Sequence, residues 1–319
     1  MTPVIIIGAG MTGLACARSL ADAGMAPVVL DKGRGIGGRV ATRRARECQF
    51  DHGAQYVNAH GAGFASVLAA LEKAGTLAGW PDGTGRTFGV GVPGMAAIPK
   101  ALGAGLHIRQ NTQVARLEQD AGGWLLHLAD GTIRAARVVV TVPAPQVAAL
   151  LGEDHPLVAA LGAVQIAPCL TLMAAVARPA QFITRKDADD PLAWIAQDNA
   201  KPGRPQGDGA LWVAQAGAAF SAAHLEDDSA TLTARMLLLL CDRLGATPAS
   251  ITYASTHRWR YARVTQPLGQ PFLCSNDGSL YLGGDWCLGA RVEAAWDSGT
   301  AIAADLLAQV MTTWADDVE

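Results

Sequence analysis

PVIIIGAGMTGLACARSLADAGMAPVVLD, residues 3–31, begins with a short apolar run rich in β-branched residues, which predicts a strand. GAGMTG follows, with its glycines at GxGxxG spacing, and LACARSLADAG then has the periodicity of a helix. APVVLD predicts a second strand that ends in an acid. The order strand, glycine turn, helix, strand and acid is the context that a dinucleotide-binding unit requires.

Each glycine of this turn has a separate physical task. Gly8 allows a tight turn, Gly10 lets a pyrophosphate approach the backbone, and Gly13 lets the helix pack close to the strand. We place Met11 and Thr12 at the same site, because the free N–H groups of a helix N-terminus attract phosphate. Asp31 stands where an acceptor for ribose hydroxyls belongs, which favours NAD or FAD over NADP. The alternative is a glycine-rich turn without a ligand.

The next segment, DKGRGIGGR (31–39), departs from an ordinary dehydrogenase helix. It resembles the second glycine motif of flavoproteins in the amine oxidase and protoporphyrinogen oxidase superfamily. The resemblance implies that Gly37 and Gly38 pass beneath the FAD pyrophosphate and that Arg39 contacts it. We add Arg34 and Lys32 as weaker candidates, since basic side chains suit a phosphate. The alternative is a flexible basic loop.

Two further stretches contribute predicted cofactor contacts. In FDHGAQYV (50–57), Gly53 and Ala54 are small enough for backbone to pass close to a flat ring, and Gln55 and Tyr56 are placed to face it. An ordinary strand and turn is the alternative there. Residues 106–142 contain three or four short strands. The superfamily resemblance implies that Val114, within this block, offers its backbone to adenine.

The segment LYLGGDWCLGARVEAAWDSGTAIAADLL (280–307) predicts a strand, a GD turn and a helix from about residue 291. The same arrangement occurs in FAD enzymes of this superfamily, where the acid holds a hydroxyl of the cofactor and the helix N-terminus points at the flavin ring. Carried over, Gly284 and Asp285 bind the cofactor. Arg291, Val292 and Glu293 lie at the loop–helix junction beside the ring. Glu293 is otherwise a simple first-turn acid favoured by the helix dipole.

GDWCLGARVEAAW, together with HRWRYAR (257–263), VGVPGMAAI (90–98), FDHGAQY (50–56) and WIAQDNAKPGR (194–204), resembles the renalase family, and its bacterial members in particular. The resemblance covers nearly the whole chain. It implies an α/β fold in which a Rossmann-type FAD-binding domain is interleaved with an α+β substrate domain, the amine oxidase/p-hydroxybenzoate hydroxylase-like architecture. We expect the FAD-binding domain to comprise residues 1–55, 93–152 and 275–319, and the substrate domain residues 56–92 and 153–274.

The resemblance also implies an activity. Renalases hold FAD non-covalently and oxidise the 2- and 6-dihydro isomers of NAD(P)H to NAD(P)+, by hydride transfer to flavin N5. O2 then reoxidises the flavin and yields H2O2. Cys287, beside the GD turn, leaves covalent flavin attachment as an alternative.

A dihydropyridine needs no strong acid or base, because its ring nitrogen supplies the electron push, so we expect aromatic and amide side chains around it. For each of the candidates given below, packing in the core or at a domain interface is the alternative. Lys201 and Arg204 would either contact a dinucleotide phosphate or be solvated. The substrate-side candidates are Gln55, Trp194, Asn199, His257, Trp259, Tyr261 and Trp286.

Composition narrows the remaining classes. The net charge of −3 disfavours a nucleic-acid partner, and the six cysteines and seven histidines lack the spacings of a zinc site or a disulfide framework. We expect a cytoplasmic monomer or weak dimer whose partners are a small-molecule substrate and O2. Residues 157–177 carry no charge, but Gln165 and Pro168 interrupt them, so we predict a buried strand entered through a turn rather than a membrane span.

Two other functions remain open. One is an amine oxidase on the same scaffold, although the sequence shows no paired-tyrosine signal near its C-terminal flavin motif. The other is a flavin-binding redox sensor without turnover, which the fold alone does not exclude.

Overall fold

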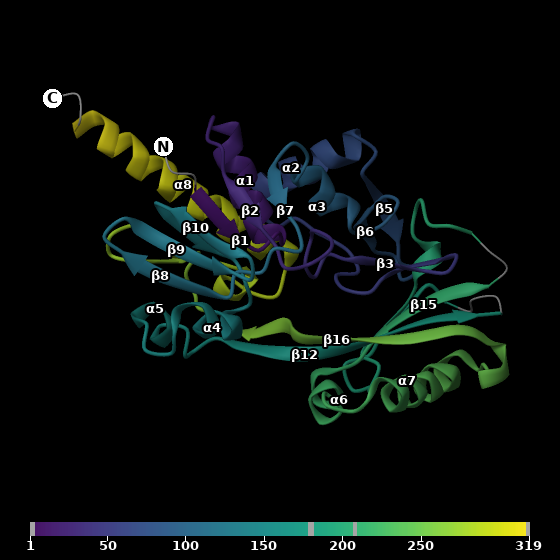
Figure 1. Cartoon of the computed structure of the whole chain (residues 1–319). Helices are drawn as coiled ribbons and strands as arrows, with labels where there is room; N and C mark the ends of the chain where they lie inside the picture. The colour runs from purple at the N-terminus through teal and green to yellow at the C-terminus, as the bar shows by residue number, and fades with distance from the viewer. Residues whose placement is uncertain (1–3, 178–181, 207–208, 317–319) are drawn as a thin grey trace. The chain divides into compact units, whose positions relative to one another are not determined.

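The apolar runs of the first 31 residues form the centre of a sheet that is mostly parallel (Figure 1). The computed structural model describes residues 4–177, 182–206 and 209–316. The chain divides into two compact units. Unit 1 comprises residues 1–38, 99–165 and 264–319, and unit 2 comprises residues 39–98 and 166–263.

Unit 1 is built on a six-stranded sheet in the order β17-β18-β11-β1-β2-β7. These strands are β1 Val4–Ile7, β2 Val28–Leu30, β7 His107–Arg109, β11 Arg137–Val140, β17 Leu273–Cys274 and β18 Leu280–Leu282. All four residues of β1 are buried, as expected for a strand covered on both faces. A second, antiparallel sheet contains β8 Arg116–Asp120, β9 Gly123–Leu128 and β10 Gly131–Ala135.

The helices of unit 1 include α1 Met11–Asp22, α4 Ala148–Leu151, α5 Pro156–Ala159 and α8 Val292–Asp316, and α3 Ala97–Leu102 begins at the end of unit 2. Helices α1 and α8 pack tightly because Gly299 of α8 has no side chain: a Cβ there would lie 2.1 Å from the Thr12 carbonyl oxygen of α1. This contact places α8, about two turns from its start, against the first turn of α1. Short 3-10 helices cover Ala144–Gln146 and Asp285–Cys287 in unit 1, and Asp198–Ala200 and Pro248–Ser250 in unit 2.

Unit 2 contains a five-stranded sheet in the order β13-β14-β15-β12-β16. Its strands are β12 Gln165–Val176, β13 Thr184–Lys186, β14 Trp194–Gln197, β15 Ala210–Gln215 and β16 Ile251–Gln266. Unit 2 also contains two hairpins, each a separate two-stranded sheet: β3 Thr42–Ala45 with β4 Cys48–Asp51, and β5 Leu77–Pro81 with β6 Thr87–Gly91. The helices of unit 2 are α2 Ala62–Lys73, α6 Ala218–Ala223 and α7 Ser229–Leu244.

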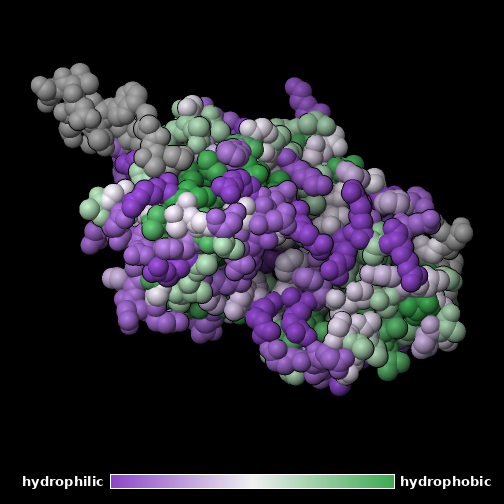
Figure 2. All heavy atoms as spheres, viewed as in Figure 1, coloured by the Kyte–Doolittle hydropathy of each residue, from purple (hydrophilic) through white to green (hydrophobic). Residues whose placement is uncertain are grey.

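Helix α7 covers one face of this sheet (Figure 1). Leu232, Met236 and Leu240, spaced four residues apart, are buried together with Leu172 and Trp212 of the sheet. The Asp228 carboxylate accepts hydrogen bonds from two N–H groups of the first turn, and Gly245 ends the helix in the left-handed region. The apolar spacing within residues 226–244 by itself predicts an amphipathic helix, and α7 lies within that stretch. On the face shown in Figure 2, polar side chains predominate and apolar residues form separate patches.

The uncharged stretch 157–177 forms the end of α5, a turn and then β12, whose last seven residues are buried. This confirms the prediction of a buried strand entered through a turn. Within the described ranges, we found no helix with both the length and the apolar character that crossing a membrane demands.

The bounds of the compact units differ from those that we expected for the two domains. Residues 39–55 and 93–98 belong to unit 2, whereas 153–165 and 264–274 belong to unit 1. The reason is visible in β4, where Phe50 packs with Met173 of β12 and Val213 of β15 in a small core. The assignment of one domain to FAD and the other to substrate stays a prediction.

Candidate functional site

The turn between β1 and α1 forms a backbone cradle in unit 1. Gly8 has a φ of 109°, and its N–H donates to the Leu30 carbonyl oxygen at 2.8 Å. A Cβ on Gly13 would lie 2.0 Å from the Gly8 carbonyl oxygen, so only glycine fits there. At Gly10, by contrast, a Cβ would meet nothing within 4 Å. The cradle is therefore closed toward the protein at Gly13 and open at Gly10, which fits the approach of a pyrophosphate.

Asp31 ties this cradle to the loop that follows β2. One carboxylate oxygen accepts from the Ala9 N–H and the other from the Gly33 N–H, both at 2.6 Å. A carboxylate oxygen can accept a second hydrogen bond. The predicted role of Asp31 as an acceptor for ribose hydroxyls is therefore compatible with its hydrogen bonds to Ala9 and Gly33.

The glycine-rich loop 33–38 returns to the same cradle. The Gly37 N–H donates to the Ala9 carbonyl oxygen at 2.7 Å, and Gly37 forms a bridge with Gly10. Gly38 has a φ of 56°, and its Cβ position would lie 3.5 Å from the Gly10 Cα. GxGxxG and the second glycine motif thus meet at Gly10 and Gly37, which are 27 positions apart in sequence but adjacent in space.

The other predicted contacts of unit 1 have different environments. Met11 and Thr12 are buried in the first turn of α1, and Val114 is buried in the loop after β7. Lys32 and Arg34 are exposed, and the Lys32 ammonium lies 3.4 Å from Gln146 Oε1.

The GD turn lies directly before α8. The Gly284 N–H donates to Ser298 Oγ at 3.1 Å, and the buried Asp285 begins the 3-10 helix Asp285–Cys287. Helix α8 then starts at Val292 as predicted, with Glu293 buried in its first turn and Arg291 exposed. An acid at this position is favoured by the partial positive charge of the helix N-terminus.

Trp286 and Cys287 are packing residues of unit 1. Both are fully buried, and the Trp286 indole N–H donates to the Val142 carbonyl oxygen at 3.1 Å. Burial raises the pKa of the Cys287 thiol to about 12, so the sulfur carries a proton at neutral pH. The placement favours the core alternative for Trp286, and it makes Cys287 a poor nucleophile for covalent attachment.

Arg39, the arginine of the GGR motif, lies at the start of unit 2. Its guanidinium donates to the Ala262 carbonyl oxygen at 3.0 Å, and its own carbonyl oxygen accepts from the Ala54 N–H at 2.8 Å. A Cβ on Gly53 would lie 1.9 Å from that same carbonyl oxygen. The backbones of Arg39 and Gly53 are therefore in direct contact, which explains why position 53 is a glycine.

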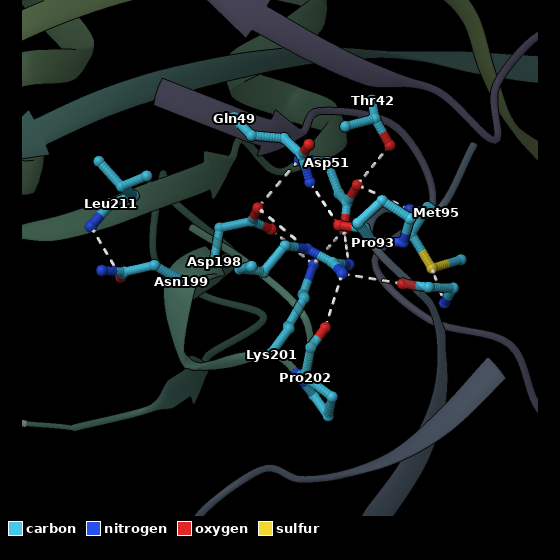
Figure 3. A network of polar contacts seen from close by, with 12 residues as sticks. Thr42, Gln49, Asp51, Pro93, Met95, Asp198, Asn199, Lys201, Pro202 and Leu211 are labelled. Carbon is cyan, nitrogen blue, oxygen red and sulfur yellow. Dashed lines mark hydrogen bonds and ion pairs between the residues drawn. The ribbon is translucent and has the colours of Figure 1, made fainter. Parts of the chain in front are cut away.

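A buried network of two carboxylates and two cations lies behind this contact (Figure 3). Lys201 Nζ is 2.7 Å from Asp198 Oδ1 and 3.3 Å from Asp51 Oδ2, and the Arg204 guanidinium pairs with Asp51. All four side chains have 0% exposure. We call Asp51, Asp198, Lys201 and Arg204 the buried tetrad. Lys201 and Arg204 are thus neither solvated nor presented to a ligand phosphate, which corrects both alternatives from the sequence.

The tetrad is electrically balanced, and hydrogen bonds fix Asp51 further. Thr42 Oγ1 and the Met95 N–H donate to Asp51 Oδ1 at 2.7 and 2.9 Å (Figure 3). Burial alone would raise the pKa of Asp51, but Lys201, Arg204 and these hydrogen bonds hold it below its usual value. Burial and the neighbouring Asp51 charge raise the pKa of Asp198. Asp51 is therefore the more firmly ionised of the two acids.

The amide of Gln55 is bound to this network rather than free. Its oxygen lies 3.3 Å from Lys201 Nζ, and its nitrogen donates to the carbonyl oxygens of Asp51 and Gly53 at 2.5 and 3.1 Å. Asn199 is similarly occupied: Oδ1 accepts from the Leu211 N–H at 3.0 Å, and Nδ2 donates to the Gly209 carbonyl oxygen at 3.0 Å. Asn199 therefore holds its own loop, and this placement favours packing over substrate contact.

Strand β4 separates the tetrad from an aromatic cluster. Because side chains alternate along a strand, Asp51 points to the tetrad, whereas Phe50 and His52 point to β16. The His52 ring lies 4.8 Å from that of His257 and 5.2 Å from that of Trp259, measured between centroids. The Trp259 indole N–H donates to the His52 carbonyl oxygen at 2.8 Å. The structure thus brings the predicted His257 and Trp259 together.

The cluster is uncharged at neutral pH. Burial and the charges of His257 and Arg43 lower the pKa of His52 to about 4, and burial and Arg43 also lower the pKa of His257. His52 was missed from the sequence because a lone histidine after a strand carries no motif. The usable signal was its alternation with Phe50 and Asp51 on a half-buried strand.

The remaining aromatic candidates have different surroundings. Tyr56 stacks on Phe88 with centroids 3.9 Å apart, and Trp194 lies 5.8 Å from Tyr56. Tyr261 is half-buried on β16, two residues beyond Trp259 and therefore on the same side of the strand.

Comparison with known proteins places these features in context. Residues 6–71 match the family model for an NAD(P)-binding Rossmann-like domain, and residues 82–307 match that for flavin-containing amine oxidoreductases. Renalase of Mus musculus is 25% identical over 333 residues, covering 92% of this chain and 97% of the mouse protein.

Solved structures resemble the fold at 14% sequence identity. A putative protoporphyrinogen oxidase from Exiguobacterium has a TM-score of 0.76 and covers 96% of this chain and 98% of its own. Cyclohexylamine oxidase from Brevibacterium oxydans has a TM-score of 0.74 and covers 97% of this chain and 99% of its own. These likenesses confirm the expected α/β fold, with its Rossmann-type and amine oxidase-type parts.

Proposed function

Because this chain belongs to the flavin-containing amine oxidoreductase family, we propose that it is a renalase-like oxidase of dihydronicotinamide dinucleotides. Membership makes the protein a flavin-dependent oxidoreductase that acts on a small molecule. The finer proposal is that non-covalent FAD is the flavin, that the 2- and 6-dihydro isomers of NAD(P)H are the substrates, and that O2 is the electron acceptor.

The residues of unit 1 fit a dinucleotide cofactor. The cradle is open at Gly10, where a Cβ would meet nothing within 4 Å, and Gly37 and Gly38 line it from the second glycine motif. The N-termini of α1 and α8 would stabilise negative charge on phosphate and on the flavin ring. We propose the following cofactor contacts: Gly8, Gly10, Met11, Thr12, Gly13, Asp31, Lys32, Arg34, Gly38, Arg39, Gly53, Ala54, Gln55, Val114, Gly284, Asp285, Arg291, Val292 and Glu293.

Bound FAD would accept a hydride from the substrate and pass the electrons to O2, which forms H2O2. The protein's own residues then have to bind and orient the dihydronicotinamide ring, because no proton transfer is needed. We assign this task to His257, Trp259 and Tyr261 of β16, on which a flat ring can pack.

The observation that carries the proposal is the uncharged imidazole and indole cluster beside Arg43. Oxidation creates a positive charge on the nicotinamide ring, and the neutral His52 and His257 do not oppose it. Arg43 lies near enough to lower the pKa of both histidines, and its positive charge suits the phosphates of a dinucleotide. A simple amine carries no phosphate for Arg43 to bind, so this surface supports a dihydronicotinamide dinucleotide over the amine alternative.

The direct test is product analysis in air. The purified yellow protein would be incubated with each dihydro isomer, with ordinary 4-dihydro NADH and with a panel of amines. The proposal predicts NAD(P)+ and H2O2 in equal amounts from an isomer, and FAD in the supernatant after acid precipitation. Aldehyde and H2O2 from an amine would instead support an amine oxidase, and no product from either class would support a redox sensor.

A further inference from the structure

A side chain of the buried tetrad, that of Lys201, contacts the predicted flavin-side segment at Gln55. Lys201 Nζ is within 3.3 Å of three oxygens: one of Asp51, one of Asp198 and Oε1 of Gln55. The first two contacts balance its charge. The third has no role in that balance, because an amide oxygen is neutral.

Gln55 passes this link on to the backbone. Its nitrogen donates to the carbonyl oxygens of Asp51 and Gly53, which closes a turn over residues 51–55. Gln215 Nε2 also donates to the Gly53 carbonyl oxygen, at 2.7 Å. Gly53 in turn lies against the backbone of Arg39, with no room for a Cβ between them. A continuous set of contacts therefore runs from Lys201 through Gln55 and Gly53 to Arg39.

We propose that Lys201 is a positioning residue, which fixes the Gln55 amide and thereby the Gly53–Gln55 segment and the Arg39 backbone for flavin binding. The inference rests on the proposed function, because it requires that Arg39 and the Gly53–Gln55 segment contact the flavin. The Lys201 side chain has 0% exposure, so in this proposal it acts through Gln55 and not by direct contact with the flavin.

If the tetrad only stabilised the fold, restoring its charge balance would restore FAD binding together with the melting temperature. Lys201→Met leaves two carboxylates facing one guanidinium, so an uncompensated buried charge lowers the melting temperature. Lys201→Met combined with Asp198→Asn removes one charge of each sign, so most of that loss is recovered. The hydrogen bond from Lys201 to the Gln55 amide oxygen is absent in both variants.

The experiment measures the melting temperature and the FAD dissociation constant of the apoprotein for the wild type and these two variants. We expect the Lys201→Met variant to lose roughly 5–10 °C and the double variant to regain most of it. We expect FAD binding to be weakened about tenfold or more in both. Recovery of FAD affinity together with the melting temperature would overturn the proposal, because the tetrad would then act through stability alone.

A double-mutant cycle with Gln55 tests the route. If Lys201 acts through Gln55, Lys201→Met and Gln55→Ala weaken FAD binding by less together than the product of their separate effects. Independent, multiplicative effects would contradict the proposal. Lys186→Met, at an exposed lysine of β13, is the matched control and should leave both quantities unchanged.

These readouts do not use the substrate, so they separate the two hypotheses. A protein that binds FAD as expected but oxidises no dihydro isomer would contradict the proposed function and leave the role of Lys201 testable. Wild-type FAD affinity in the Lys201→Met variant would contradict only the positioning role of Lys201.

Discussion

Two glycines of the GxGxxG motif differ in what a Cβ atom would contact at their positions. Gly10 and Gly13 belong to one motif, yet a Cβ at Gly10 would enter open space, whereas one at Gly13 would lie 2.0 Å from the Gly8 carbonyl oxygen. We therefore propose that Gly10 leaves room for the ligand, whereas Gly13 is required for the contact of helix with strand.

Gly10→Ala is expected to weaken FAD binding while lowering the free energy of unfolding of the apoprotein by less than about 1 kcal/mol. Gly13→Ala is expected to impair both, with a loss of about 1–3 kcal/mol from overpacking. Urea unfolding of apoprotein and FAD titration measure the two quantities. Equal destabilisation by both substitutions would contradict the distinction.

The lowered pKa of His52 makes the free energy of unfolding depend on pH. Its pKa in the folded protein is about 4, against 6.5 for the free side chain, so folding favours the neutral imidazole. The stabilising contribution is present above pH 6.5 and is lost as the pH falls toward 4, because the unfolded chain then binds the proton more readily.

We expect His52 to account for up to about 3 kcal/mol of the loss of unfolding free energy between pH 6.5 and pH 4. In His52→Asn the dependence of unfolding free energy on pH should be shallower over this interval. His107→Asn, at an exposed histidine of β7, is the control and should keep the wild-type slope. An unchanged slope in His52→Asn would show that His52 does not titrate as described.

At the scale of elements, α1 and α8, which follow the GxGxxG turn and the GD turn respectively, pack closely against each other. Gly299 of α8 allows it, because a Cβ there would meet the Thr12 carbonyl oxygen at 2.1 Å. Gly299→Ala should force the helices apart, lower the unfolding free energy by about 1–3 kcal/mol and reduce flavin content. Ala304→Ser, on the exposed side of α8, should change neither. Normal stability in Gly299→Ala would contradict the close packing.

The elements that could be predicted from sequence are those whose signals are local. Strand β1, helix α1 and strand β2 follow from β-branched runs, glycine spacing and helical periodicity, and α7 follows from its apolar repeat. The tetrad could not be predicted in this way, since Asp51 and Arg204 are separated by 153 positions and nothing local in either segment indicates their pairing. The same holds for His52 and Trp259, which are 207 positions apart.

At the scale of the whole molecule, the two compact units carry different parts of the proposed chemistry. Unit 1 supplies the dinucleotide cradle and the N-termini of α1 and α8. Unit 2 supplies Arg39, the buried tetrad and the uncharged cluster of His52, His257 and Trp259. The chain crosses between the units directly after Gly38, so the GGR motif is divided between them.

The central claim is that the bound flavin is reduced by a misreduced nicotinamide. The measurement that tests it most directly is stopped-flow absorbance of the oxidised flavin band without O2, after mixing with each dihydro isomer, ordinary NADH or an amine. The account predicts fast bleaching by the 2- or 6-dihydro isomer and none by ordinary NADH. Bleaching only by ordinary NADH or by an amine would contradict it.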